Sequence, residues 1–224
     1  MLLPGMDGTG RLFAGLMARL PGAIEGRVIA YPPDLALDYE QLLARVRPLC
    51  PTSGDWYVLG ESFSGPLALR LAAERPPGLR GVILAASFVA PPVRWVPPWL
   101  VRPGLLTMGR GIAGRVLGTG DGPRGLHAAF VAASASVAAD VLACRARAIL
   151  GVDLRPFAAR LAAVPVLALV GQRDRVLGRG HVAAIAELLP QVLVRRFDAP
   201  HLLLQTRAAE AAAAISAFMR CGES

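Results

Sequence analysis

Ser62 lies in the stretch GESFSGPLAL, residues 60–69, between a short apolar run and an alanine- and leucine-rich segment. A Gly-x-Ser-x-small pattern that follows a strand and opens a helix is typical of a nucleophilic serine, because its strained turn needs small residues two positions before and after it. Gly60 and Ser64 occupy these positions, although glycine is more usual than serine at the second. The alternative is an inert serine at a tight turn.

A serine nucleophile needs a base within hydrogen-bonding reach, and the base needs a carboxylate that orients it. The chain has three histidines. His127 falls in an irregular region, His181 begins a predicted helix, and His201 follows the last predicted strand in FDAPHLLLQT. The order serine, acid, histidine places the base on the loop after the final strand, so His201 is the predicted base.

Asp174 is the predicted acid, because it follows the apolar segment Val164–Val170 in VPVLALVGQRDRVL. The carboxyl ends of parallel strands share one edge of a sheet, which would bring Asp174 to Ser62 and His201. Asp174 could instead cap the following helix, with Asp153 or Asp198 as the acid, although Asp198 is close in sequence to His201.

Acyl transfer also requires two backbone N–H groups that stabilise the oxyanion. Phe63, directly after the serine, is the first predicted donor. Met6 in LLPGMDGTG is the second, because Gly5 would let the backbone turn sharply before it. Asp7 is expected to hold this loop through side-chain-to-backbone hydrogen bonds, with contact to substrate as the alternative, and Glu61 to be solvated or paired locally.

Apolar, β-branched runs alternate with segments of helical period, which predicts an α/β fold with a mostly parallel sheet of about six strands flanked by helices. The predicted strands are Met1–Leu3, Arg27–Tyr31, Trp56–Leu59, Gly81–Ala85, Val164–Val170 and Val192–Phe197. The predicted helices are Leu12–Leu20, Tyr39–Arg47, Ser64–Glu74, Gly180–Leu189 and Ala208–Arg220.

The alternation is interrupted over residues 91–160, which begin with the proline-rich PPVRWVPPWLVRPG and continue into an alanine-rich segment, Leu126–Ile149, that fits one or two helices. We expect residues 1–90 and 161–224 to form the core and residues 91–160 to form a helical lid, hereafter the insertion. Trp95 and Trp99 either line an acyl pocket under this lid or anchor it.

In these features the chain resembles the α/β-hydrolase family over nearly its whole length, and PGMDGTG with GESFSGPLAL is similar to a subgroup of ester hydrolases and acyltransferases that includes plastid phytyl ester synthases. Members usually have two strands before the oxyanion strand, whereas this chain starts at MLLPG. The resemblance therefore implies either a shortened sheet lacking those strands or an upstream segment that has been lost.

Composition excludes several other classes. The 224 residues carry a formal net charge of +8, but the sequence contains no lysine and its arginines are scattered, which argues against a nucleic-acid partner. No apolar run is long enough for a membrane span, and no secretory leader is recognisable, so a cytoplasmic protein is expected. The three cysteines have no metal-ligand spacing, and no cofactor is predicted. Composition leaves the oligomeric state open.

The expected activity is hydrolysis of a small-molecule carboxylic ester by a Ser62, Asp174 and His201 triad. The apolar insertion favours medium or long acyl chains, since each buried methylene contributes about 0.8 kcal/mol. A thioesterase or acyltransferase using the same residues, or a non-catalytic binding protein on the same scaffold, is the alternative.

Overall fold

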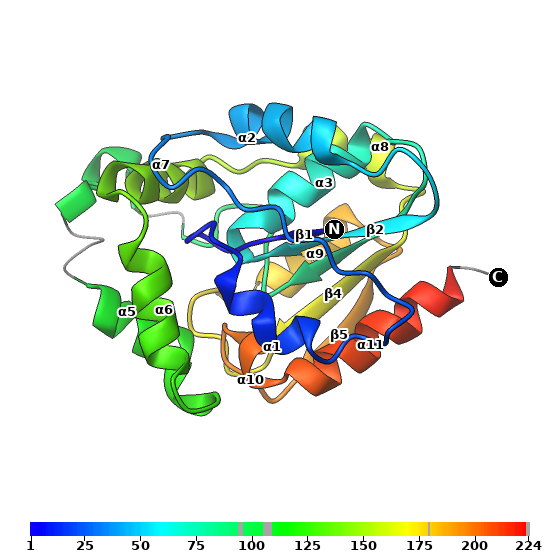
Figure 1. Ribbon diagram of the computed structural model, residues 1–224. Coiled ribbons are helices and arrows are strands. Elements are labelled where there is room, and N and C mark those ends of the chain that lie inside the picture. Colours follow the sequence, from blue (N-terminus) through cyan, green and yellow to red (C-terminus); the bar gives the residue numbers. More distant parts are fainter. Residues whose placement is uncertain (94–95, 105–108, 179, 223–224) are drawn as a thin grey trace.

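The computed structural model describes residues 1–93, 96–104, 109–178 and 180–222, and its centre is a parallel sheet of five strands (Figure 1). The strands lie across the sheet in chain order: β1 (Leu2–Leu3), β2 (Trp56–Glu61), β3 (Leu79–Ala85), β4 (Val166–Gly171) and β5 (Leu193–Phe197). The three central strands β2, β3 and β4 are almost entirely buried, which explains their nearly continuous apolar sequences, whereas the edge strand β5 is partly exposed and carries two arginines.

The predicted strand Arg27–Tyr31 is not a strand, and the sheet has five strands where about six were expected. The segment meets β1 through a single bridge between Leu2 and Val28. The Leu2 N–H donates to the Arg27 carbonyl at 2.7 Å, and the Ile29 N–H donates to the Leu2 carbonyl at 3.0 Å. Since β1 has only two residues, it offers no partner for a longer ladder.

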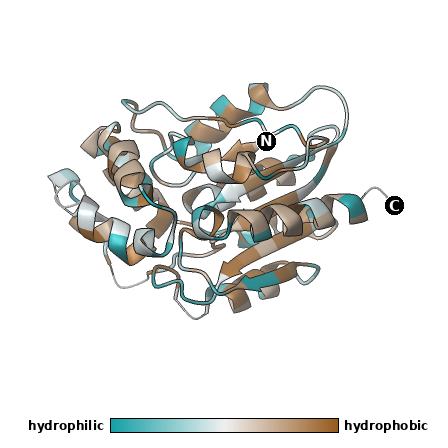
Figure 2. Ribbon diagram, turned by 60° about the horizontal axis from the view of Figure 1, so that its bottom comes forward, coloured by the Kyte–Doolittle hydropathy of each residue, from teal (hydrophilic) through white to brown (hydrophobic). Residues whose placement is uncertain are grey.

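Side chains of the central strands alternate between two apolar clusters, one on each face of the sheet. Val58 and Val82 belong to the cluster that includes residues of α2, α3, α8 and α9, whereas Leu59 and Ile83 belong to the cluster that includes residues of α1, α10 and α11. Figure 2 shows hydrophobic colouring along the central strands. The helices are α1 (Ala14–Met17), α2 (Tyr39–Val46), α3 (Gly65–Ala73), α8 (Ala158–Leu161), α9 (His181–Leu188), α10 (Leu203–Thr206) and α11 (Ala208–Cys221).

The insertion between β3 and β4 contains α5 (Arg110–Leu117), α6 (Leu126–Ala135) and α7 (Ala139–Leu150), with short 3-10 turns at Pro98–Leu100, Thr119–Asp121 and Arg155–Phe157. The alanine-rich segment thus forms two helices. Figure 1 shows α5, α6 and α7 grouped beyond one end of the sheet. The last part of the insertion returns to the core, because Val152 and Leu154 are buried in the cluster around α3.

Among the described residues, no single helix has the length and apolarity needed to cross a membrane. The pair α6 and α7 meets those criteria only when taken together, and the chain bends by 101° between the two helices.

Candidate active site

Each strand of the sheet contributes one residue to a cluster at its carboxyl edge. Met6 follows β1, Ser62 follows β2, Ser87 follows β3, Asp174 follows β4 and His201 follows β5. The glycine that ends β4 allows the last two loops to approach each other, since a Cβ at Gly171 would lie 2.6 Å from the carbonyl oxygens of Ala199 and Pro200.

Ser62, His201 and Asp174 form a continuous hydrogen-bonded chain. The Ser62 Oγ lies 2.8 Å from the His201 Nε2, and the His201 Nδ1 lies 2.7 Å from the Asp174 Oδ2. An ionised carboxylate can only accept, so the His201 Nδ1 carries the proton and its Nε2 accepts from the Ser62 hydroxyl. The three predicted residues are therefore brought together in the geometry of a nucleophile, a base and an orienting acid.

The Asp174 carboxylate is held ionised inside the protein, with only 2% of its side chain exposed. Burial alone would raise its pKa, but hydrogen bonds from His201, Leu177 and Val176 outweigh that effect and lower the pKa below its ordinary value. The Oδ1 accepts from the Val176 N–H at 2.8 Å and the Leu177 N–H at 3.0 Å. Asp174 thus also makes the local turn contacts that a capping residue would make.

The other two acids considered from the sequence lie in surface ion pairs. Asp153 accepts from its neighbour Arg155 at 2.8 Å. Asp198 pairs with Arg173 at 2.5 Å, and Arg173 also pairs with Asp121 of the insertion.

Ser62 has a left-handed backbone conformation, with φ of +47°, which is strained for a residue with a side chain. Close contacts between the strand and the following helix enforce it, since a Cβ at Gly60 would lie 2.4 Å from the Ser64 carbonyl oxygen. Two side chains hold the turn from either side. The Ser87 hydroxyl donates to the Ser62 carbonyl at 2.6 Å, and the Tyr39 hydroxyl donates to the Phe63 carbonyl at 2.7 Å.

Ser64 has a specific role where glycine is usual. Its buried hydroxyl donates to the Pro4 carbonyl, and it lies 2.6 Å from the Tyr31 hydroxyl. A serine hydroxyl has one proton, so the Tyr31 hydroxyl must be the donor in the second bond. Ser64 therefore joins the turn that carries Ser62 to the loop that carries Met6.

The loop after β1 makes a tight turn in which the Gly8 N–H donates to the Gly5 carbonyl at 2.9 Å. The sharp conformation is at Gly8, with φ of +70°, and not at Gly5 as predicted. Among the described residues, no acceptor is found for the Met6 and Phe63 N–H groups. As predicted for Asp7, its carboxylate holds the loop, accepting from the N–H and hydroxyl of Thr9.

Of the two expectations for Glu61, solvation is wrong, because the side chain is buried and paired. It is 6% exposed and accepts from the Gln205 Nε2 at 2.8 Å. Burial raises the pKa of Glu61 to about 7, against the opposing effect of the Gln205 hydrogen bond. A buried carboxyl group that changes charge near neutrality therefore lies directly beside Ser62.

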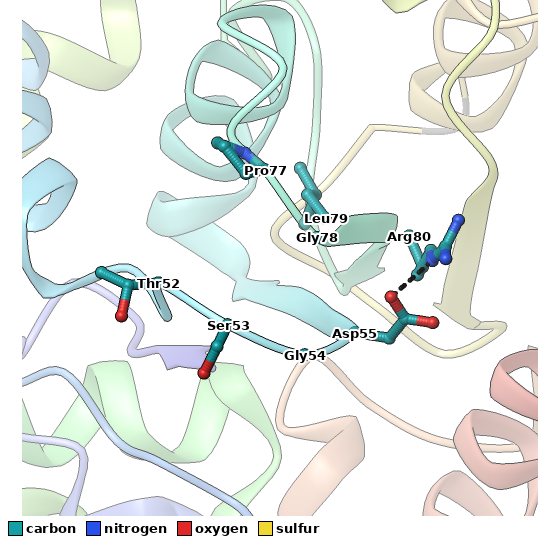
Figure 3. Close-up of a pocket in the computed structure, with 8 residues that line it drawn as sticks. All are labelled: Thr52, Ser53, Gly54, Asp55, Pro77, Gly78, Leu79 and Arg80. Atoms are coloured by element: carbon teal, nitrogen blue, oxygen red, sulfur yellow. Dashed lines mark ion pairs between the residues drawn. The ribbon is translucent and has the colours of Figure 1, made fainter.

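The two tryptophans of the proline-rich stretch are predicted either to line an acyl pocket or to anchor the lid. Trp95 lies outside the described residues, and Trp99 is 72% exposed to solvent. A shallow cavity of about 410 Å³ lies at the opposite, amino edge of β2 and β3 (Figure 3). Its charged residues are the half-exposed pair Asp55 and Arg80, 2.8 Å apart. Within the described residues, no group of histidine, cysteine and acidic side chains is arranged to hold a metal ion.

Sequence reasoning did not identify four residues that support the cluster. Three are the hydroxyl donors and acceptors Ser87, Tyr31 and Tyr39, and the fourth is Arg145 of α7, whose guanidinium contacts the loop after β1. The sequence offered one signal for Arg145. It follows Val141 by four residues and Leu142 by three, which places its side chain on the same face of a helix as these apolar residues.

No protein-family model and no curated protein sequence matches this chain. Solved structures do match it. An esterase from Exiguobacterium antarcticum has a TM-score of 0.77 at 17% identity, over 98% of this chain and 90% of that one. A lipase-esterase related protein from Clostridium acetobutylicum has a TM-score of 0.72 at 16% identity, over 97% and 92%. A bromoperoxidase from Bacillus anthracis has a TM-score of 0.75 at 17% identity, over 98% and 90%.

Proposed function

We propose that this chain, which has the α/β-hydrolase fold, is a serine hydrolase that cleaves carboxylic esters. The single observation that carries the proposal is the chain of short contacts from the Ser62 Oγ to His201 and from His201 to Asp174. An inert turn serine would have no reason to be strained at φ +47° beside a buried imidazole. The esterases among the structural neighbours agree with this activity.

In the proposed reaction, the Ser62 oxygen attacks the ester carbonyl while the His201 Nε2 takes the hydroxyl proton. Asp174 orients the imidazole and stabilises its charged form. The Met6 and Phe63 N–H groups stabilise the oxyanion. The imidazolium then protonates the departing alcohol, and a water molecule activated by His201 releases the acyl group from Ser62.

An apolar acyl group suits the surroundings of Met6. Its side chain packs against Val137, Val141 and Leu142 of the insertion. We therefore propose that the insertion covers a medium or long acyl chain, as a lid would.

The proposal is tested with p-nitrophenyl esters of increasing chain length, measured on the wild-type protein and on Ser62→Ala. We expect a burst of nitrophenol stoichiometric with enzyme, turnover that increases from acetate towards longer chains, and neither signal in Ser62→Ala. Ser53→Ala, at an exposed position, serves as the matched control and should behave as wild type.

Equal turnover by the wild type and Ser62→Ala would refute the serine mechanism, and a strict preference for acetate would refute the acyl-chain assignment. Folded protein that binds the ester without releasing any nitrophenol would indicate a non-catalytic binding protein. Added alcohol that diverts the acyl group from water would indicate transfer by the same residues.

A further inference from the structure

Arg145 is a buried cation with an unusual set of partners. Its side chain is 1% exposed, although buried guanidinium groups are normally paired with a carboxylate. Its Nη1 donates to the carbonyls of Met6 and Asp7, both at 2.9 Å, and its Nη2 donates to the Pro32 carbonyl at 3.0 Å. Among the described residues no carboxylate lies within ion-pair distance of Arg145. Its charge is therefore directed at backbone dipoles of the loop after β1.

Five consecutive carbonyl groups of this loop accept hydrogen bonds, which fixes every peptide plane from residue 4 to residue 8. The Pro4 carbonyl accepts from the Ser64 hydroxyl, and the Gly5 carbonyl accepts from the Gly8 N–H. The Met6 and Asp7 carbonyls both accept from Arg145, and the Gly8 carbonyl accepts from the Tyr31 N–H. Only Arg145 comes from the insertion.

The loop is shaped to admit the guanidinium. A Cβ at Gly8 would lie 2.5 Å from the Arg145 Nη1, and Gly8 also has a positive φ of +70°. The guanidinium lies over the Tyr31 ring, with the central carbon 5.5 Å from the ring centre. The same helix packs Val141 and Leu142 against the Met6 side chain. The insertion thus holds Met6 at both its carbonyl and its side chain.

We propose that Arg145 is a positioning residue that holds the Gly5–Gly8 turn so that the Met6 N–H faces the developing oxyanion. The inference rests on the proposed esterase function. The Gly5 carbonyl, which shares a peptide plane with the Met6 N–H, accepts from the Gly8 N–H, and Arg145 fixes the next two peptide planes through the Met6 and Asp7 carbonyls. The buried positive charge of Arg145 also contacts the carbonyl of Met6, the residue whose N–H is the proposed donor, and there it favours a negative charge on the substrate oxygen.

The test compares Arg145→Met and Arg145→Lys with the wild type, using kcat, KM and the Ki of a trifluoromethyl ketone that forms an oxyanion on Ser62. Removing one oxyanion donor typically lowers kcat about 10²–10³-fold. Because Arg145→Met would misplace the Met6 N–H without deleting it, we expect a smaller loss, of roughly 10–100-fold in kcat. The ketone Ki should weaken by a similar factor, with KM within about threefold. Arg145→Lys, which keeps one charged donor, should recover part of both losses.

Arg147→Met is the matched control, because Arg147 lies on the same helix and is exposed. It should change neither parameter more than about twofold, as expected for a surface substitution. If Arg145→Met does not fold, Arg145→Lys decides, because lysine keeps the positive charge but lacks the planar fork that reaches the Met6, Asp7 and Pro32 carbonyls together.

Unchanged kcat and ketone Ki in folded Arg145 variants, or a change confined to KM, would overturn this inference while the wild-type activity stands. Absence of Ser62-dependent turnover in the wild type would instead refute the proposed function itself.

Discussion

Replacing Ser64 by alanine should destabilise the protein, although position 64 is one where a smaller residue is usual. The substitution removes the acceptor of the buried Tyr31 hydroxyl and the donor to the Pro4 carbonyl. Each buried polar group left without a partner costs roughly 1–3 kcal/mol, so we expect the free energy of unfolding to fall by about 2–6 kcal/mol. In a chain of this size, about 1 kcal/mol corresponds to a shift of roughly 2–4 °C in Tm.

A double-mutant cycle with Tyr31→Phe separates the two contacts. In the Tyr31→Phe background, Ser64→Ala leaves only the Pro4 carbonyl without a partner. The loss of unfolding free energy caused by Ser64→Ala should therefore be smaller there by roughly 1–3 kcal/mol. Urea unfolding followed by circular dichroism measures all four proteins, with Ser53→Ala as an exposed serine control. Equal losses of unfolding free energy in both backgrounds would show that the Ser64 hydroxyl is not coupled to Tyr31, and a neutral Ser64→Ala would show that it does not link the two loops.

Two further predictions concern carboxyl groups. Burial raises the pKa of Glu61 from 4.5 to about 7, so its contribution to stability is present below pH 4.5 and is lost as the pH rises through 7. As the pH rises from 4.5 to above 7, the unfolding free energy of the wild type should fall by roughly 3 kcal/mol relative to that of Glu61→Gln. Curves of unfolding free energy against pH that run parallel for the two proteins would contradict this. Asp174→Asn should lower kcat by roughly 10³–10⁴-fold, because an amide no longer fixes the protonated Nδ1. The loss is measured against Asp198→Asn, and comparable losses in both variants would reassign the acid.

The grouping of Ser62, Asp174 and His201 could be predicted because their positions follow from local patterns. Each residue follows a predicted strand, and parallel strands bring their carboxyl ends to one edge of the sheet. The segment around Val28 has the same local pattern but forms only one bridge, since pairing depends on the length of the neighbouring strand.

The supporting contacts could not be predicted in this way, because they join positions far apart in sequence. In the sequence, Ser64 only occupies a position of the Gly-x-Ser-x-small pattern where glycine is more usual. Its contacts with Pro4 and Tyr31 become visible only in the fold. Arg145 is one of two arginines in the alanine-rich segment, and nothing local indicates that its partners are carbonyl groups 138 and 139 residues away.

The most direct test of the central claim is mass-spectrometric mapping of the adduct formed with a fluorophosphonate probe on the intact, folded protein. We predict a single adduct on Ser62, none on Ser62→Ala, and labelling of His201→Gln slowed at least about 100-fold, because the general base is absent. An adduct on another residue, or wild-type labelling rates in His201→Gln, would contradict the account.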